Sequence, residues 1–307
     1  ISHMPLNKIQ NILLITFSTI GALSYILFTN SFIQDDLTLL FLCFFLILVL
    51  GVSHGALDHI RGKRILEPKF DKAWSILFFP GYIILGLIVI ISWLNFPPVT
   101  LLLFLITAGY HFGEEDLSFF KKGNGIMFST VSFLKGFLII TLSFHYSFEN
   151  TSLFFEYLMV PQYYYEALIP LKSTLFSINL ICLVAGLIYL FKNNINHLVL
   201  ILLEVLLITL SFVYLPLILA FSLYFCFLHS SKHIIGLARE LDEKDIKNGL
   251  KLFSIKAVPL TCITALAAVL FVFLLSEKLD ENIIKTIFIG LASLTLPHIL
   301  LDILDKK

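Results

Sequence analysis

Charged residues are scarce in this chain of 307 residues, because aspartate, glutamate, lysine and arginine make up only 14% of it. Soluble domains carry about 25% charged residues, so the composition argues against a soluble globular domain. The 58% share of apolar residues excludes a disordered chain. The 21 basic and 21 acidic residues cancel, so no basic surface for nucleic acid is expected.

Paired cysteines are also missing. The four cysteines lie singly inside apolar runs, without a CxxC spacing. Neither a disulfide framework nor a thiolate metal site is therefore predicted. No cleavable signal peptide is evident, and residues 1–3, which precede Met4, are interpreted as a remnant of expression.

The chain does contain long apolar runs. A bilayer core of about 30 Å needs roughly 20 apolar residues per helix. Ten segments reach or approach this length: 8–29, 37–60, 73–95, 97–113, 125–146, 172–191, 195–214, 216–236, 255–276 and 283–304. The sequence therefore predicts an all-α integral membrane protein of about ten transmembrane helices. Residues 1–307 are expected to form a single polytopic membrane domain.

Two stretches between the spans have a different composition. Residues 147–171 are rich in aromatic side chains and too polar to span, so they are expected to be an interfacial segment. Residues 237–254 are expected to form a cytoplasmic loop with an amphipathic helix.

Positive charge gives the orientation. If the N-terminus is cytoplasmic, the inner loops and tails hold 17 of the 21 lysines and arginines. Because these residues favour the cytoplasmic side, both termini are predicted to be cytoplasmic. The expected location is the cell inner (cytoplasmic) membrane, as a multi-pass protein.

Six histidines fall into four short clusters, whereas His145 and His197 stand apart from acidic and histidine neighbours. The clusters are SHGALDH (53–59), YHFGEED (110–116), LHSSKH (228–233) and PHILLD (297–302). Each lies toward the C-terminal end of an even-numbered span, so all four are predicted at one depth, in the cytoplasmic half. Polar groups at membrane depth are costly and usually mark function. A joint metal or catalytic site is therefore favoured over a purely structural polar network.

Spacing within the clusters adds chemical detail. His229 and His233 are four residues apart, which places both imidazoles on one helix face. Asp58, Glu115 and Asp302 each follow a histidine by four residues. Such a carboxylate could bind a metal or orient a neighbouring imidazole, or it could simply face the cytoplasm at a helix end. Glycines flank two of the histidines and would permit close helix approach or local unwinding: Gly51, Gly55, Gly109 and Gly113.

The identity of the metal is less constrained. Imidazole ligands suit zinc, copper, iron and nickel, so oxygen chemistry on non-haem iron and hydrolysis on zinc both stay open. The 31 phenylalanines imply an apolar substrate, which favours the iron chemistry.

In order and spacing, HGxxDH, YHxGxxD, HxxxH and PHxxLD resemble the motifs of the Brp/Blh family. These are membrane-integral β-carotene dioxygenases of bacteria and archaea, and the similarity covers nearly the whole chain. The resemblance implies a non-haem iron carotenoid cleavage dioxygenase of retinal biosynthesis. Its reaction would be Fe(2+)-dependent oxidative cleavage of the central double bond of β-carotene by dioxygen, giving two retinal molecules. Delivery of retinal to a rhodopsin is a further implication.

The resemblance also assigns residues. It implies that the catalytic iron ligands are His54, His111, His229 and His233. It implies that supporting or alternative ligands are His59, His298, Asp58, Glu115 and Asp302. Tyr110, next to His111, either hydrogen-bonds to oxygen or simply packs.

Two other functions stay open. One is a di-metal lipid hydroxylase or desaturase, although such enzymes usually carry more histidines, in HxxHH-type clusters. The other is a non-enzyme, either a proton-coupled transporter that uses Glu204 or a retinal-binding photoreceptor. A photoreceptor would need a lysine buried mid-span, for which Lys135 and Lys232 are the approximate candidates.

The position of His54 along its span bears on how a carotenoid would bind. His54 lies about 17 residues into the span, or roughly 25 Å at 1.5 Å per residue. A carotenoid that spans the bilayer would put its central double bond elsewhere, near the midplane. We hypothesise that the substrate enters sideways from the lipid and lies bent or tilted in an aromatic-lined tunnel.

Overall fold

The structure is a computed structural model that describes residues 5–29, 36–121 and 125–305. Within these ranges the chain forms helices and connecting loops and contains no strand. Residues 1–3, interpreted above as an expression remnant, lie outside the described residues.

Fourteen α-helices follow one another in the described part of the chain. They are α1 (Leu6–Thr29), α2 (Asp36–Leu46), α3 (Asp58–Phe70), α4 (Trp74–Asn95), α5 (Pro97–Asp116), α6 (Ile126–Tyr146), α7 (Phe148–Tyr157), α8 (Gln162–Glu166), α9 (Lys172–Phe191), α10 (Ile195–Tyr214), α11 (Leu217–Leu223), α12 (Ser231–Leu241), α13 (Ile246–Leu274) and α14 (Leu279–Asp305). Two π-helical turns, η1 (Ile47–Gly51) and η6 (Tyr224–Ser230), continue α2 and α11. The 3₁₀ turns are η2 (Val52–Leu57), η3 (Asp71–Ala73), η4 (Ser118–Phe120) and η5 (Ile169–Leu171).

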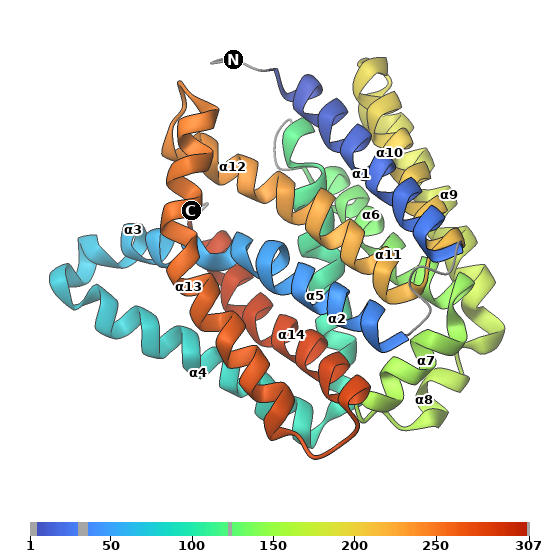
Figure 1. The fold of residues 1–307 in the computed structure, drawn as a ribbon. Coiled ribbons are helices and arrows are strands. Elements are labelled where there is room, and N and C mark those ends of the chain that lie inside the picture. The colour runs from blue at the N-terminus through green and yellow to red at the C-terminus, as the bar shows by residue number, and fades with distance from the viewer. Residues whose placement is uncertain (1–4, 30–35, 122–124, 306–307) are drawn as a thin grey trace.

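Eight segments of the described chain are long and apolar enough to cross a membrane. One of them, 36–95, contains two predicted spans, because helical structure continues through the turn between α3 and α4. Helices α3 and α4 are nevertheless two separate helices, which pack against each other (Figure 1). The predicted span 97–113 is not among the eight, because prolines at its start and polar residues at its end lower its hydropathy. The all-α integral membrane fold is confirmed, while the count of ten and the side of the termini stay predictions.

The two stretches of unusual composition are more helical than expected. Residues 147–171 form α7, α8 and η5, which gather at one end of the bundle (Figure 1). In the stretch 237–254, α12 ends at Leu241 and α13 begins at Ile246, after a short turn. The Asp245 side chain accepts a 2.9 Å hydrogen bond from the Lys247 amide and so caps α13.

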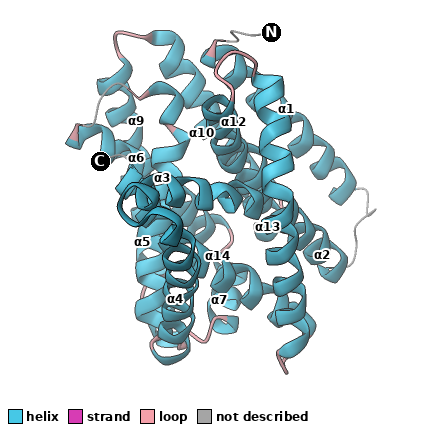
Figure 2. Ribbon diagram, turned by 90° about the vertical axis from the view of Figure 1, so that its left-hand side faces the viewer, coloured by secondary structure: helices cyan, strands magenta, loops and turns pink. Residues whose placement is uncertain are grey.

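The packing of α14 shapes the region where the histidines meet. This helix packs against both α4 and α13, and Figure 2 shows α4 and α13 on opposite sides with α14 between them. The two π-helical turns, η1 and η6, also pack against each other. Gly51 at the end of η1 leaves room for the Phe225 ring, which a Cβ would approach to 2.9 Å at Cδ1.

Helices α5 and α6 pack backbone to backbone. A Cβ on Gly113 of α5 would collide with the Ser132 carbonyl oxygen, and one on Gly136 of α6 would collide with that of Gly109. Small residues at such crossings are typical of membrane helices. The close approach brings the C-terminal end of α5, with its histidine and acidic residues, against α6.

We expect Gly113→Ala to destabilise the protein, because the new methyl group has no space and the helices must separate. Overpacking costs about 1–3 kcal/mol, which a thermal unfolding curve of the detergent-solubilised protein measures. Gly21→Ala in α1 is the matched control, since nothing lies within 4 Å of its added Cβ. Equal unfolding temperatures for the two variants would contradict the close approach.

Candidate metal and substrate site

Five histidines from the four sequence clusters gather in the interior. The ring centroid of His54 lies 5.5 Å from that of His229 and 5.4 Å from those of His233 and His298. The ring of His111 lies 5.1 Å from His229 and 5.0 Å from His298. The clusters therefore meet, which agrees with their common predicted depth.

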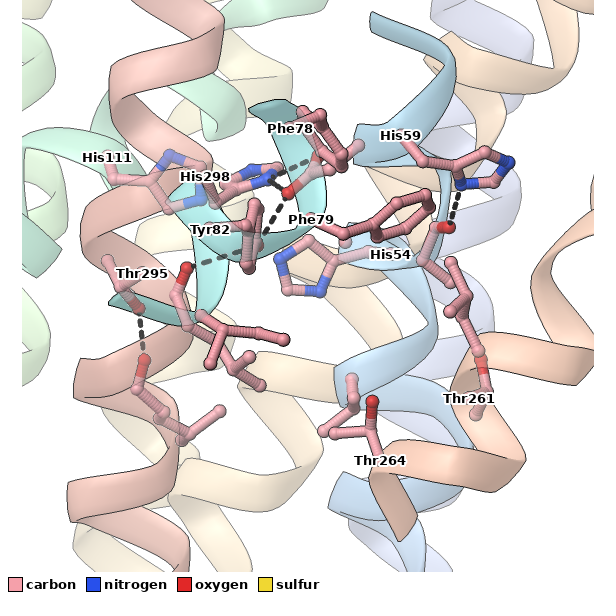
Figure 3. A pocket seen from close by; sticks show the side chains of 18 of the residues that line it. His54, His59, Phe78, Phe79, Tyr82, His111, Thr261, Thr264, Thr295 and His298 are labelled. Carbon is pink, nitrogen blue, oxygen red and sulfur yellow. Dashed lines mark hydrogen bonds and ion pairs between the residues drawn. The ribbon is translucent and has the colours of Figure 1, made fainter. Parts of the chain in front are cut away.

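Three of these side chains bring nitrogen atoms closest together. One ring nitrogen each from His54, His111 and His298 lies within 4.8 Å of the other two (Figure 3). Nitrogen donors about 2.1 Å from one ion lie at most about 4.2 Å apart, so small side-chain rotations would bring the three to metal distance. His298 was expected only as a supporting or alternative ligand, yet it belongs to this closest trio.

Partners on the opposite ring nitrogen hold several of these imidazoles. His298 Nδ1 donates to the Asp58 carboxylate at 2.9 Å, and His233 Nδ1 lies 3.0 Å from Glu115 Oε2. His54 Nδ1 donates to the Gly51 carbonyl. A partner on one nitrogen sets the tautomer and leaves the other nitrogen for a metal.

The carboxylates pair between helices rather than along them. Asp58 follows His54 in sequence but contacts His298, and Glu115 follows His111 but contacts His233. Asp302, which follows His298, lies 3.4 Å from the Arg61 guanidinium instead. Two of the three predicted carboxylates therefore support an imidazole of another helix.

Several ring nitrogens remain without a partner. Both nitrogens of His229 and the Nε2 atoms of His233 and His298 are buried and have no hydrogen bond within the described part of the chain. An unsatisfied buried polar atom costs about 1–3 kcal/mol, and coordination of a metal would satisfy one nitrogen on each of these rings. The donor set fits a first-row transition metal, for which imidazole is a favoured ligand.

Tyr82 of α4 supports the same arrangement. Its hydroxyl donates a 2.8 Å hydrogen bond to Asp58 Oδ2, on the carboxylate that also holds His298 (Figure 3). Sequence reasoning missed this residue, because it lies in an apolar span with no polar neighbour to mark it.

A buried network of four charged residues lies behind the histidines. Lys135 Nζ contacts Asp116 Oδ2 at 2.5 Å and Glu204 Oε1 at 2.6 Å. Lys232 Nζ contacts Glu204 Oε2 at 2.7 Å and the Asp116 carbonyl at 2.9 Å. Gln10 of α1 donates to Glu204 as well. Two lysines and two carboxylates neutralise one another, which accounts for Glu204 inside its span.

Asp116 connects this network to the histidines. Its Oδ2 accepts a 3.0 Å hydrogen bond from the Tyr224 hydroxyl, and its Oδ1 lies 3.8 Å from His229 Nδ1. Asp116 is only 1% exposed, so it does not face the cytoplasm as a solvated helix end would. The spacing between His111 and Asp116 did not predict this role, because Asp116 contacts a histidine of another part of the chain.

The remaining histidines and Tyr110 lie away from the cluster. His59 Nδ1 lies 3.0 Å from the Ala56 carbonyl, and its ring is directed away from His54 and His298 (Figure 3). Tyr110 is 39% exposed on the outer side of α5. His145 stacks on Phe176, and His197 bonds to Asn194.

A cavity of about 290 Å³ leads to the closest trio. Residues of α4, α13 and α14 line it, so it lies between the helices that Figure 2 shows on opposite sides of α14. Ile83 on its α4 wall is 61% exposed, so the cavity reaches the apolar perimeter of the bundle. Aromatic rings make up much of the rest of the lining: Phe78, Phe79, Tyr82, Phe104, Phe112 and Phe225.

Comparison with known proteins agrees with this arrangement. A family model described as Beta-carotene 15,15'-dioxygenase matches residues 45–305, a region that contains all four histidine clusters. The chain belongs to this family. It is 26% identical over 261 residues to a beta-carotene 15,15'-dioxygenase from uncultured marine bacterium 66A03, which covers 83% of this chain and 90% of that relative. No solved structure is significantly similar. The family resemblance drawn from the four motifs is confirmed.

We expect Lys135→Met to destabilise the protein strongly, because the buried Asp116 carboxylate would lose its lysine contact and Glu204 would keep only Lys232. Removing one partner of a buried ion pair costs about 3–5 kcal/mol, which thermal unfolding in detergent would report. The double variant Lys135→Met, Glu204→Gln removes one charge of each sign and should recover part of the loss. A single variant as stable as the wild type would show that the network contributes little.

Proposed function

We propose that this protein is an iron(II)-dependent dioxygenase that cleaves the central double bond of β-carotene into two retinal molecules. The observation that carries the proposal is the cluster of unpartnered imidazole nitrogens at the inner end of an apolar, aromatic-lined cavity. The relative's name supplies the substrate and the use of dioxygen. An apolar cavity that reaches the lipid-facing side suits a substrate dissolved in the membrane.

The proposed ion lies among the five histidines. His54, His111 and His298 offer the closest nitrogens, and His229 and His233 adjoin them. Iron is proposed rather than zinc, because zinc has no redox chemistry to offer dioxygen. The five histidines gather around one point, which suits a single ion, so the di-metal hydroxylase is the weaker alternative.

Bound iron(II) would supply the activation of dioxygen. In the net reaction the carbon–carbon double bond and the oxygen–oxygen bond both break, and each carbon receives one oxygen atom. Two aldehydes form, and no other electron donor is needed. The cavity walls hold the polyene against the histidines and exclude water, which is how positioning contributes to rate. The chain from Tyr82 through Asp58 to His298 holds that imidazole in one orientation.

The membrane setting extends the proposal. We place this multi-pass protein in the cell inner membrane, with both termini cytoplasmic, as the distribution of lysine and arginine predicts. Retinal is still mostly hydrocarbon, with one aldehyde at its new end, so release into the bilayer and delivery to a rhodopsin form the proposed last step.

We expect about one iron per chain after anaerobic loading of the purified protein. His298→Ala should lose most of this iron, whereas His59→Ala should retain it, because His59 bonds to a backbone carbonyl away from the cluster. Elemental analysis of both variants measures the difference, with the double variant His229→Ala, His233→Ala as a second test of the site. Full iron in His298→Ala would remove it from the ligand set. Two irons per chain would favour a lipid hydroxylase.

We expect the wild type to form two retinal molecules for each dioxygen consumed, with β-carotene supplied in detergent micelles. Asp58→Asn should lower the rate of retinal formation about 10–100-fold, the usual loss when the partner of a metal-binding histidine is removed. Tyr82→Phe should have a smaller effect, because Asp58 keeps its charge and its contact with His298. Chromatography of the products against time measures all three. Unchanged turnover in Asp58→Asn would contradict the role given to this carboxylate.

A further inference from the structure

A second cavity lies on the far side of two phenylalanines from the first. Its volume is about 90 Å³, and side chains of α5, α6, α7, α11 and α14 form its walls. Phe104 and Phe112 of α5 line both cavities. The two cavities are therefore neighbours separated by these two rings.

The second cavity is apolar throughout. None of its lining residues is charged, and the polar ones are Ser143 and Thr151. The Ser143 hydroxyl donates to the Ile139 carbonyl at 2.8 Å, and the Thr151 hydroxyl donates to the Ser147 carbonyl at 2.8 Å. Both hydroxyls are thus occupied by backbone, so the cavity presents hydrocarbon and aromatic surface to any occupant.

Helix α5 runs from the second cavity to the histidines. Leu101 and Ala108 line the second cavity, and His111 lines the first. With a rise of about 1.5 Å per residue, Leu101 lies roughly 15 Å along the helix from His111. The two cavities therefore extend to either side of the rings of Phe104 and Phe112, and the histidines lie close to these rings.

The rings of Phe104 and Phe112 are held in place to different extents. The Phe112 ring lies 4.6 Å from that of His229 and 5.9 Å from that of Phe225, within the packed histidine cluster. The Phe104 ring is half-buried, and its centroid lies 5.9 Å from that of the Trp93 ring. Rotation of Phe104 would join the cavities while Phe112 stays beside His229.

We propose that the second cavity binds the far half of the substrate, the isoprenoid arm beyond the double bond that is cut. This inference rests on the proposed carotenoid cleavage. A polyene that is cut at its middle extends equally to both sides of the reacting bond, so it needs an apolar site on each side of the histidines. The first cavity takes the arm nearer the lipid opening, and the second takes the arm that has passed Phe104. The depth of the second cavity sets how far the polyene slides inward and hence which bond reaches the histidines.

The test fills the second cavity from two walls. Ala108, which is 4% exposed, lines only the second cavity, as does Ser143 on α6. We expect Ala108→Phe and Ser143→Leu each to lower retinal formation about 100-fold, the loss that displacement of a substrate by about 1 Å can cause. We also expect the cut to move off centre, giving one aldehyde longer and one shorter than retinal, with one oxygen atom still added to each new end.

Ile106→Phe is the matched control. Ile106 lies on the same helix, is 44% exposed on its outer side and lines neither cavity. It should keep wild-type rate and products. Iron content and thermal unfolding of all variants separate a blocked cavity from a damaged fold, because a filled cavity leaves bound iron unchanged.

The outcomes distinguish this inference from the proposed function. Central cleavage at the wild-type rate in both filled variants would overturn the inference alone. Loss of iron together with activity in both filled variants would also overturn it, since the loss would then come from the metal site. A wild-type protein that binds iron but cleaves no carotenoid would overturn the proposed function and the inference with it.

Discussion

The pairing of Asp116 with Lys135 inside the bundle is the interaction on which the site depends. A charge buried away from water is costly unless it is paired, and here Glu204 and Lys232 complete a neutral set of four. The helices that carry these residues are α5, α6, α10 and α12. Because α5 also carries His111 and α12 also carries His233, the ion pairs hold two of the histidine-bearing helices in one relative position. Glycines at the α5–α6 crossing let the backbones of these two helices come into contact.

The sequence was informative about the depth of each histidine along its helix and much less so about the rotation of each helix about its own axis. Apolar segment length and the bias of lysine and arginine place each histidine at a height along its span, and helices at equal height can meet. The gathering of the four histidine clusters agrees with that argument, whereas the place of His298 in the closest trio does not follow from it. The partners of these imidazoles do not follow from it either, because they depend on how each helix is turned about its axis. Spacing by four residues pointed to Asp58 beside His54, whereas the structure places it on His298.

Departures from regular α-helix explain part of that difference. The 3₁₀ turn η2 contains His54 and ends just before Asp58, so these two residues do not keep the spatial relation that four residues have in an α-helix. The two π-helical turns each insert a wider turn and shift the phase of every later side chain, and such turns are common at functional sites. One ends just before the segment that carries His54, and the other contains His229. The argument that His229 and His233 share a face assumed a regular α-helix through both residues. No pattern in the sequence marks the wider turns, although Gly51 ends one of them where the Phe225 ring packs.

The cavity between α4 and α13 also determines which measure of substrate concentration governs occupancy of the site. An apolar molecule that arrives through the side of the bundle comes from a two-dimensional solution, so occupancy of the site follows its mole fraction among the lipids. The volume of surrounding water does not enter. For the proposed carotenoid substrate, adding lipid or detergent at a constant amount of carotenoid would lower this mole fraction, and enriching one leaflet or one patch of membrane would raise it. The composition of the bilayer would then enter the rate law.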